Sequence, residues 1–95
     1  MLVHLVAFKY KPEVDEARRA RHRAALAGLD VIDGVLELKV GADVMHLSRS
    51  YDLGLLVKFR DRAALEAYAT DPRHVPVAQE GVALAAHIVS VDFEA

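Results

Sequence analysis

Four segments of the chain carry apolar residues in a short, strand-like pattern, and three others have helical spacing or strong helix propensity. The predicted strands cover residues 2–10, 35–42, 51–59 and 87–93. The predicted helices cover residues 13–29, 62–70 and 72–86, and the last two form one helical region. This gives the order β-α-β-β-α-β, which is the split arrangement found in ferredoxin-like folds.

The two faces of each predicted strand indicate its place in the sheet. Strand 2–10 is apolar on both faces and strand 51–59 is nearly so, which is typical of central strands that are covered on both sides. Strands 35–42 and 87–93 each have one more polar face, which predicts edge strands. We therefore expect an antiparallel sheet in an α+β fold.

Two helical regions can cover only one face of such a sheet. We expect the other face to expose Val6, Phe8, Leu55 and their neighbours. An apolar patch of that size on a monomer marks an interface. The simplest arrangement is a two-fold homodimer in which the two sheets pack face to face.

The start of the last helix is open to two interpretations. Asp61 is a good N-cap for the helix before it, residues 62–70. Pro76 complicates the next start, because an interior proline removes a backbone donor. Either Asp71 caps a helix with Pro72 at its first position, or the helix begins at Pro76.

The composition limits the class of protein. The chain has 95 residues, so we expect one domain, residues 1–95. A hydrophobic share of 54% excludes disorder, and it favours an oligomer because so small a domain buries only about 60–65% of its unfolded surface. The net charge of −2 argues against a nucleic-acid partner.

The sequence also argues against membranes, metals and cofactors. No apolar run approaches the ~18 residues of a membrane span, and the first residues have the pattern of a strand rather than a signal peptide. The absence of cysteine fits a cytoplasmic protein. No two histidines lie two to four residues apart, and no glycine-rich phosphate loop or dinucleotide fingerprint is present. We therefore expect no cofactor and no local metal site, which leaves open a metal site assembled from distant parts of the chain.

Three side chains are candidates for acid–base chemistry. His4 lies on the same strand face as Val6 and Phe8, where an imidazole can be neutral and act as a hydrogen-bonding group or base. His74 lies near the start of the last helix, where the helix dipole favours the neutral imidazole that a general base requires. Tyr68 ends the preceding helix, and its phenol can donate a hydrogen bond to a carbonyl that gains negative charge.

Each candidate also has a purely structural interpretation. His4 can be a core or interface histidine that is satisfied by a backbone group. His74 can be a residue that holds the turn at the helix start. Tyr68 can be a core tyrosine whose hydroxyl has a partner.

The other three histidines are expected to have no chemical role, because single scattered histidines are usually surface residues. His22 lies among arginines, on what we expect to be a solvated helix face. His46 lies in a polar loop, and His87 opens an edge strand.

Short motifs are spread in order over nearly the whole chain. They are HLVAFKYK at residues 4–11, DGV at 33–35, SYD at 50–52 leading to Phe59, Tyr68 followed by DPRH at 71–74, and DFE at 92–94. In this order and spacing they resemble the stress-responsive A/B barrel domain, a part of the dimeric α/β barrel superfamily. That family usually has Pro at position 33 and often His at position 71, where this chain has Asp at both.

The resemblance implies a homodimer whose two sheets form a barrel-like core. One plant branch of the family contains a cofactor-free polyketide cyclase that closes a ring by intramolecular aldol condensation. Residues matching His4, Tyr68 and His74 belong to its active site, where His74 matches the base and Tyr68 its partner. That enzyme also has a histidine on the third strand, where this chain has Leu53, so the cavity expected here is more apolar.

We therefore expect a homodimer that binds a small hydrophobic, carbonyl-bearing molecule in a largely apolar cavity between sheet and helices. The residues expected to line the cavity are Val6, Phe8, Leu53 and Leu55. If the protein is an enzyme, His74 takes a proton and Tyr68 stabilises the enolate, with His4 beside them, in a cyclisation or isomerisation without cofactor. The alternative is a non-catalytic, stress-associated assembly protein. A less favoured reading is a haem- or flavin-using monooxygenase of the same superfamily.

Overall fold

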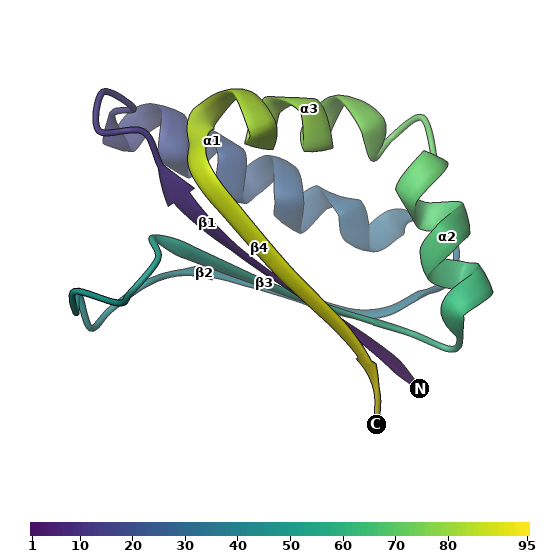
Figure 1. The fold of residues 1–95 in the computed structure, drawn as a ribbon. Coiled ribbons are helices and arrows are strands. Elements are labelled where there is room, and N and C mark those ends of the chain that lie inside the picture. Colours follow the sequence, from purple (N-terminus) through teal and green to yellow (C-terminus); the bar gives the residue numbers. More distant parts are fainter.

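The four strands form one antiparallel sheet in the order β2-β3-β1-β4. The computed structural model covers residues 1–95, and its strands are β1 (Leu2–Tyr10), β2 (Val35–Ala42), β3 (Leu53–Phe59) and β4 (Ala85–Glu94). The predicted central strands, β1 and β3, are the two inner strands, and the predicted edge strands lie outside them. Figure 1 shows all the helices on one face of this sheet, so the predicted ferredoxin-like α+β fold is confirmed.

The first helix is shorter than predicted. Helix α1 covers Glu16–Ala27 and is followed by a short 3-10 helix, η1 (Gly28–Val31). It begins after Asp15, whose backbone is extended and whose carboxylate accepts a hydrogen bond from the Arg18 backbone N–H at 2.9 Å. A carboxylate in this capping position satisfies one of the free N–H groups of the first turn, so the residues before Asp15 stay outside the helix.

The second helix has its predicted bounds, and the third begins near Pro76, the later of its two predicted starts. Helix α2 covers Arg62–Thr70, and the Asp61 side chain caps it. Helix α3 covers Val75–Leu84, with Pro76 in its first turn, where a missing N–H costs no helical hydrogen bond. A helix from Pro72 is therefore wrong, because the chain makes a turn between α2 and α3 that Asp71 holds together.

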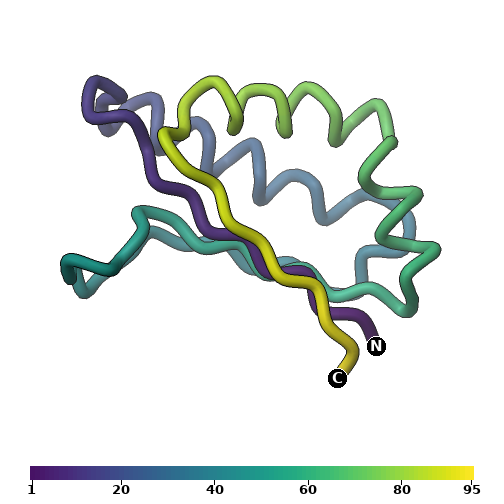
Figure 2. Tube along the Cα trace, in the orientation of Figure 1, coloured from purple at the N-terminus to yellow at the C-terminus, as the bar shows by residue number.

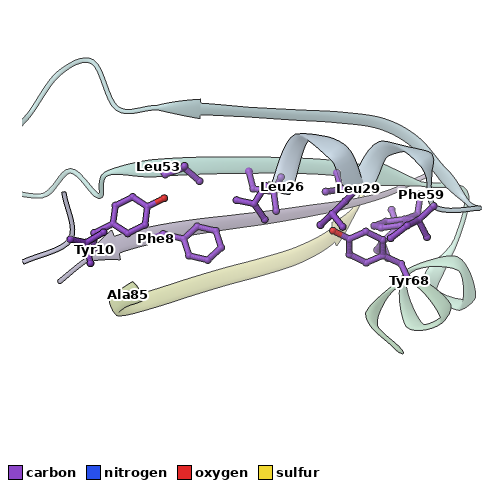
Figure 3. Packing of buried hydrophobic residues seen from close by; sticks show 13 residues of the cluster. Phe8, Tyr10, Leu26, Leu29, Leu53, Phe59, Tyr68 and Ala85 are labelled. Carbon is purple, nitrogen blue, oxygen red and sulfur yellow. The ribbon is translucent and has the colours of Figure 1, made fainter. Parts of the chain in front are cut away.

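The helix-side face of the sheet carries the core. Because side chains alternate along a strand, the even-numbered residues of β1 point to the helices and the odd-numbered ones point away. The expectation that the uncovered face carries Val6, Phe8 and Leu55 is wrong, since Phe8 and Leu55 belong to the buried core and Val6 packs against it. Figure 3 shows the core as one layer of side chains between the sheet and α1, running from Tyr10 at one end to Phe59 at the other.

The uncovered face of the sheet is apolar and hollowed. A depression of about 770 Å³ lies on it, with small residues in the middle of its floor. Gly41 and Gly54 are direct cross-strand partners there, and Ala7 continues the same row onto β1. Larger apolar side chains flank the row, and these are Leu5, Leu56, Val89 and Val91. The patch therefore exists, formed by residues one position along the strands from those predicted.

The central strand β1 joins the beginning of the chain to its end. Its residues Leu2 to Tyr10 pair along β4, and the backbone N–H of Ala95 donates to the Met1 carbonyl at 2.9 Å. Figure 2 shows the two ends side by side at one corner of the sheet. No helix has the length and apolar character needed to cross a lipid bilayer.

Candidate functional site

The fold brings His4, Tyr68 and His74 together at the α2 end of the sheet. The ring centre of Tyr68 lies 4.4 Å from that of His74 and 6.4 Å from that of His4. Phe59 packs at an angle against the tyrosine ring, with 5.0 Å between ring centres. Residues from β1, the end of α2 and the start of α3 thus form one aromatic cluster, which we call the β1–α2–α3 cluster (His4, Phe59, Tyr68 and His74).

His4 is oriented by a carboxylate from the neighbouring strand. The β1–β4 register places Asp92 directly beside His4, and Nδ1 of the imidazole donates a hydrogen bond to Oδ1 of that carboxylate. A carboxylate that holds Nδ1–H fixes the tautomer and leaves Nε2 as the free acceptor. Asp92 was not among the predicted site residues; the signal that would have found it is the pairing of the first and last strands.

His74 is held in the same way by a backbone group. It occupies the residue before α3, and its Nδ1 lies 3.0 Å from the carbonyl oxygen of Ala69. A carbonyl can only accept, so Nδ1 carries the proton and Nε2 of the neutral ring holds the lone pair. The helix-start position predicted for His74 is confirmed.

Tyr68 is the buried centre of the cluster. Its side chain is 1% exposed, and its hydroxyl has no hydrogen-bond partner within the chain. Burial raises the pKa of this phenol to about 12, so it stays protonated and able to donate at neutral pH. Figure 3 shows the hydroxyl pointing away from Phe59 and toward Leu29.

Three of the four predicted lining residues are packed inside the core. Phe8, Leu53 and Leu55 are 6%, 2% and 5% exposed, whereas Val6 keeps more of its surface. The 770 Å³ depression lies on the opposite face of the sheet from His4 and Tyr68. A role of the four predicted lining residues in binding a ligand therefore stays a prediction.

The helices leave the β4 edge of the sheet open on the cluster's side. Asp92 and Ile88 of β4 share the helix-side face with His4, and they are 42% and 40% exposed. The His4 side chain itself is 17% exposed. His4 can therefore be reached from solvent along β4, past Asp92, whereas Phe59 and Tyr68 are covered.

A fully buried histidine lies at the other end of the core. The expectation of a solvated His22 is wrong, because this side chain is 0% exposed and lies between α1, α3 and β1. Its Nδ1 is 2.6 Å from the Tyr10 hydroxyl, and its ring packs edge-on against Phe8 with 5.0 Å between centres. The available signal was its spacing from Leu26 and Leu29, because positions i, i+4 and i+7 share one helix face.

The remaining histidines lie on the surface, as predicted. The side chain of His46 is 80% exposed in the loop between β2 and β3, and His87 is exposed on β4. No group of three or more His, Cys, Asp or Glu side chains is arranged to hold a metal ion.

Several solved structures are similar to this chain over nearly its full length. A dimeric ferredoxin-like protein of unknown function from Jannaschia sp. CCS1 is 33% identical, with a TM-score of 0.83 over 99% of this chain and 98% of that chain. A second such protein, from Thermobifida fusca YX, is 21% identical, with a TM-score of 0.91 over 99% of this chain and 90% of that chain. A hydroxynitrile lyase from Passiflora edulis is 18% identical, with a TM-score of 0.87 over 97% of this chain and 90% of that chain.

The likeness to the last two structures shows the fold alone, because identity is low. A comparison with curated proteins finds no match. The family described as Stress responsive A/B Barrel Domain matches residues 2–95, which is almost the whole chain. The chain therefore belongs to the stress-responsive A/B barrel domain family.

Proposed function

We propose that the protein is a homodimer that binds a small, apolar, carbonyl-bearing molecule at the β1–α2–α3 cluster and moves a proton on it without a cofactor. The observation that carries the proposal is the buried Tyr68 hydroxyl without a partner, beside two imidazoles whose Nδ1 atoms are both engaged. An unpaired buried hydroxyl costs about 1–3 kcal/mol. A ligand carbonyl that accepts its hydrogen bond would recover this energy.

The proton transfer is assigned to His74. With Nδ1–H bound to the Ala69 carbonyl, Nε2 is the basic atom of the neutral ring. It would take a proton from the carbon next to the ligand carbonyl, so that the C–H bond breaks and its electron pair moves into an enolate. Tyr68 would donate to the enolate oxygen, and its pKa of about 12 keeps it protonated while it does so.

His4 is assigned a supporting role beside these two residues. The Asp92 carboxylate holds its Nδ1–H, so Nε2 faces away from Asp92 as a hydrogen-bond acceptor. A hydroxyl or acidic C–H of the ligand would bind there. The predicted contacts with Phe8, Leu53 and Leu55 require the helix layer to loosen, since these side chains are buried beneath the helices.

The dimer rests on the uncovered face of the sheet. A soluble monomer rarely exposes an apolar patch of this kind, and Val91 and Phe93 on it are 54% and 43% exposed. The Jannaschia and Thermobifida relatives are described as dimeric. Packing two such sheets around a two-fold axis would bury both patches at once.

The first test is native mass spectrometry of freshly purified protein. A complex near twice the 10.4 kDa chain mass supports the homodimer, and a monomer contradicts it. Additional mass on the dimer from a small molecule carried through purification supports the ligand site. The mass of that molecule then identifies its class.

The second test measures proton abstraction directly. Acetophenone, a minimal aromatic ketone, is incubated with the protein in D₂O, and deuterium uptake at its methyl carbon is followed by NMR. His74→Asn keeps a donor near the Ala69 carbonyl but removes Nε2, so the uptake rate should fall by ~10²–10⁴. His46→Asn is the matched control, because it removes an exposed histidine and Asn tolerates the positive φ of that position. Equal rates in the two variants would remove His74 from the proposal.

A second candidate function, assembly without catalysis, is favoured by the packed core. Phe8, Leu53 and Leu55 fill the space between sheet and helices, as they would in a purely structural protein. The two functions differ in their dependence on Tyr68. An assembly protein needs the ring but not the hydroxyl, so Tyr68→Phe should leave its oligomeric state unchanged, whereas a catalyst loses deuterium exchange.

A further inference from the structure

Helix α3 packs closely against the core at Gly81. This glycine is the one buried residue of α3, and a Cβ added to it would lie 3.1 Å from the Phe8 ring and 3.2 Å from Nε2 of His22. Both distances are shorter than ordinary carbon contacts. The backbone of α3 therefore rests directly on the His22 imidazole.

His22 has no room for a second proton at this contact. Its Nδ1 is engaged with the Tyr10 hydroxyl at 2.6 Å, while Nε2 is buried without a partner and faces α3. An imidazolium needs an acceptor for both N–H groups. Protonation would place a charge and an unsatisfied donor against the backbone of α3, which is costly in a dry contact.

The charged groups around His22 do not remove this cost. Glu80 of α3 favours the protonated ring, but burial is the larger effect and lowers the pKa of His22 below its usual value. Arg19 and Arg23 of α1 lie on the side of Tyr10, with the Arg19 guanidinium 4.9 Å from the centre of the tyrosine ring. Their positive charges do not favour a further cation beside Tyr10.

Two carboxylates lie near the same arginines and already pair with them. Asp52, just before β3, is 3.9 Å from Arg19, and Glu16 of α1 is 2.8 Å from Arg23. These ion pairs largely neutralise the two carboxylates, so they give His22 little electrostatic stabilisation in its protonated form. A protonated His22 would therefore be stabilised by water, which reaches the ring only when α3 moves away from it.

We propose that the contact between His22 and Gly81 is acid-sensitive, so that protonation of His22 releases α3 from α1 and β1 while the sheet stays folded. Release of α3 would expose the helix-side surface around Phe8. It would also free the start of α3, where His74 lies. This acid-sensitive contact does not depend on the proposed proton transfer, because His22 and Tyr10 lie at the opposite end of the core from Tyr68.

The test is amide hydrogen exchange of the intact protein between pH 5 and 7.5, corrected for the intrinsic effect of pH on exchange. As the pH falls below 6.5, the opening of residues 75–84 should increase by up to about tenfold per unit, the slope of one bound proton. Exchange in β1 and β3 should change much less. In His22→Phe, which keeps an aromatic ring but cannot be protonated, the opening should not depend on pH.

Two further measurements complete the test. His74→Asn, a control that removes another histidine at α3, should keep the full slope. NMR titration of the wild-type histidines should show His22 titrating together with the opening of α3, and this result does not depend on any variant folding. The proposal is overturned if the slope persists in His22→Phe, if the opening titrates with another histidine, or if β1 and β3 open equally, since that is global unfolding.

Discussion

Each of the three partly or fully buried imidazoles is held at Nδ1, and the nature of its partner determines what Nε2 can do. Asp92 holds His4, the Ala69 carbonyl holds His74, and the Tyr10 hydroxyl is paired with His22. The first two partners accept only, so they leave Nε2 as a base. The hydroxyl can either donate or accept, which leaves His22 as the ring whose protonation state the surrounding packing controls.

The two buried tyrosines offer a matched pair for measuring the value of a hydroxyl. Tyr68→Phe removes a hydroxyl without a partner, so the free energy of unfolding should rise by about 1 kcal/mol. Tyr10→Phe removes the partner of His22, so the free energy of unfolding should fall by about 1–3 kcal/mol. Urea denaturation of both variants measures the difference. A loss of stability in Tyr68→Phe would show that its hydroxyl has a partner in solution.

The orientation of His4 provides a spectroscopic prediction. In Asp92→Ala the acceptor at Nδ1 is lost, so His4 should no longer be restricted to the Nδ1–H tautomer. Long-range ¹H–¹⁵N NMR spectra distinguish the two tautomers of each ring. Asp43→Ala is the control, since it removes a carboxylate 3.6 Å from the exposed His46 and should leave His4 unchanged.

At the scale of elements, segments with one dominant signal were predicted well. The bounds of β1, β2 and α2 match the prediction. A short apolar run defines β1, alternation defines β2 and the Asp61 cap defines the start of α2, and all three signals are local. The burial of His22 on α1 was not predicted, because this residue stands in a run of arginines whose charge suggests solvent. Burial of a polar ring depends on a partner from another element, here Tyr10, and no local pattern contains that information.

Helix α3 supplies a prediction that runs against helix propensity. Gly81→Ala should favour an isolated helix by about 0.5–1 kcal/mol. In this protein the added methyl group would press on Phe8 and His22, so α3 should be displaced and exchange its amide hydrogens faster, even at pH 7.5. Gly28→Ala, where nothing lies within 4 Å of the new methyl group, is the control. Slower exchange in Gly81→Ala would show that the contact at Gly81 is loose.

At the scale of the whole molecule, the sequence predicts the fold and the need for an interface but assigns the wrong strand face to it. When a strand is apolar on both faces, its sequence does not indicate which face the helices cover. The face is determined by helix contacts such as Tyr68 with His4 and His22 with Phe8. The same limit applies to the site. His4, Tyr68 and His74 were predicted, whereas Phe59 was not, and Asp92 joins them only through strand pairing.

The proposed dimer can be tested by placing a charge on the uncovered face. Leu56 lies between Leu5 and Lys39 of the adjacent strands, near the middle of the depression. Leu56→Lys would bury an unpaired ammonium group in the interface, so the dimer should dissociate. Sedimentation velocity measures the change in mass. Val44→Lys, at an 82% exposed loop position, should remain dimeric, and an intact dimer in both variants would place the interface elsewhere.

The pairing of β1 with β4 has a consequence for synthesis of the protein on the ribosome. The central strand is made first, but one of its two neighbours is made last, and the His4–Asp92 pair joins residues 88 positions apart. Contacts between such distant residues form late and slowly. A nascent chain therefore has a half-paired β1 until β4 emerges, and the site proposed for proton transfer is complete only in the same step that closes the sheet.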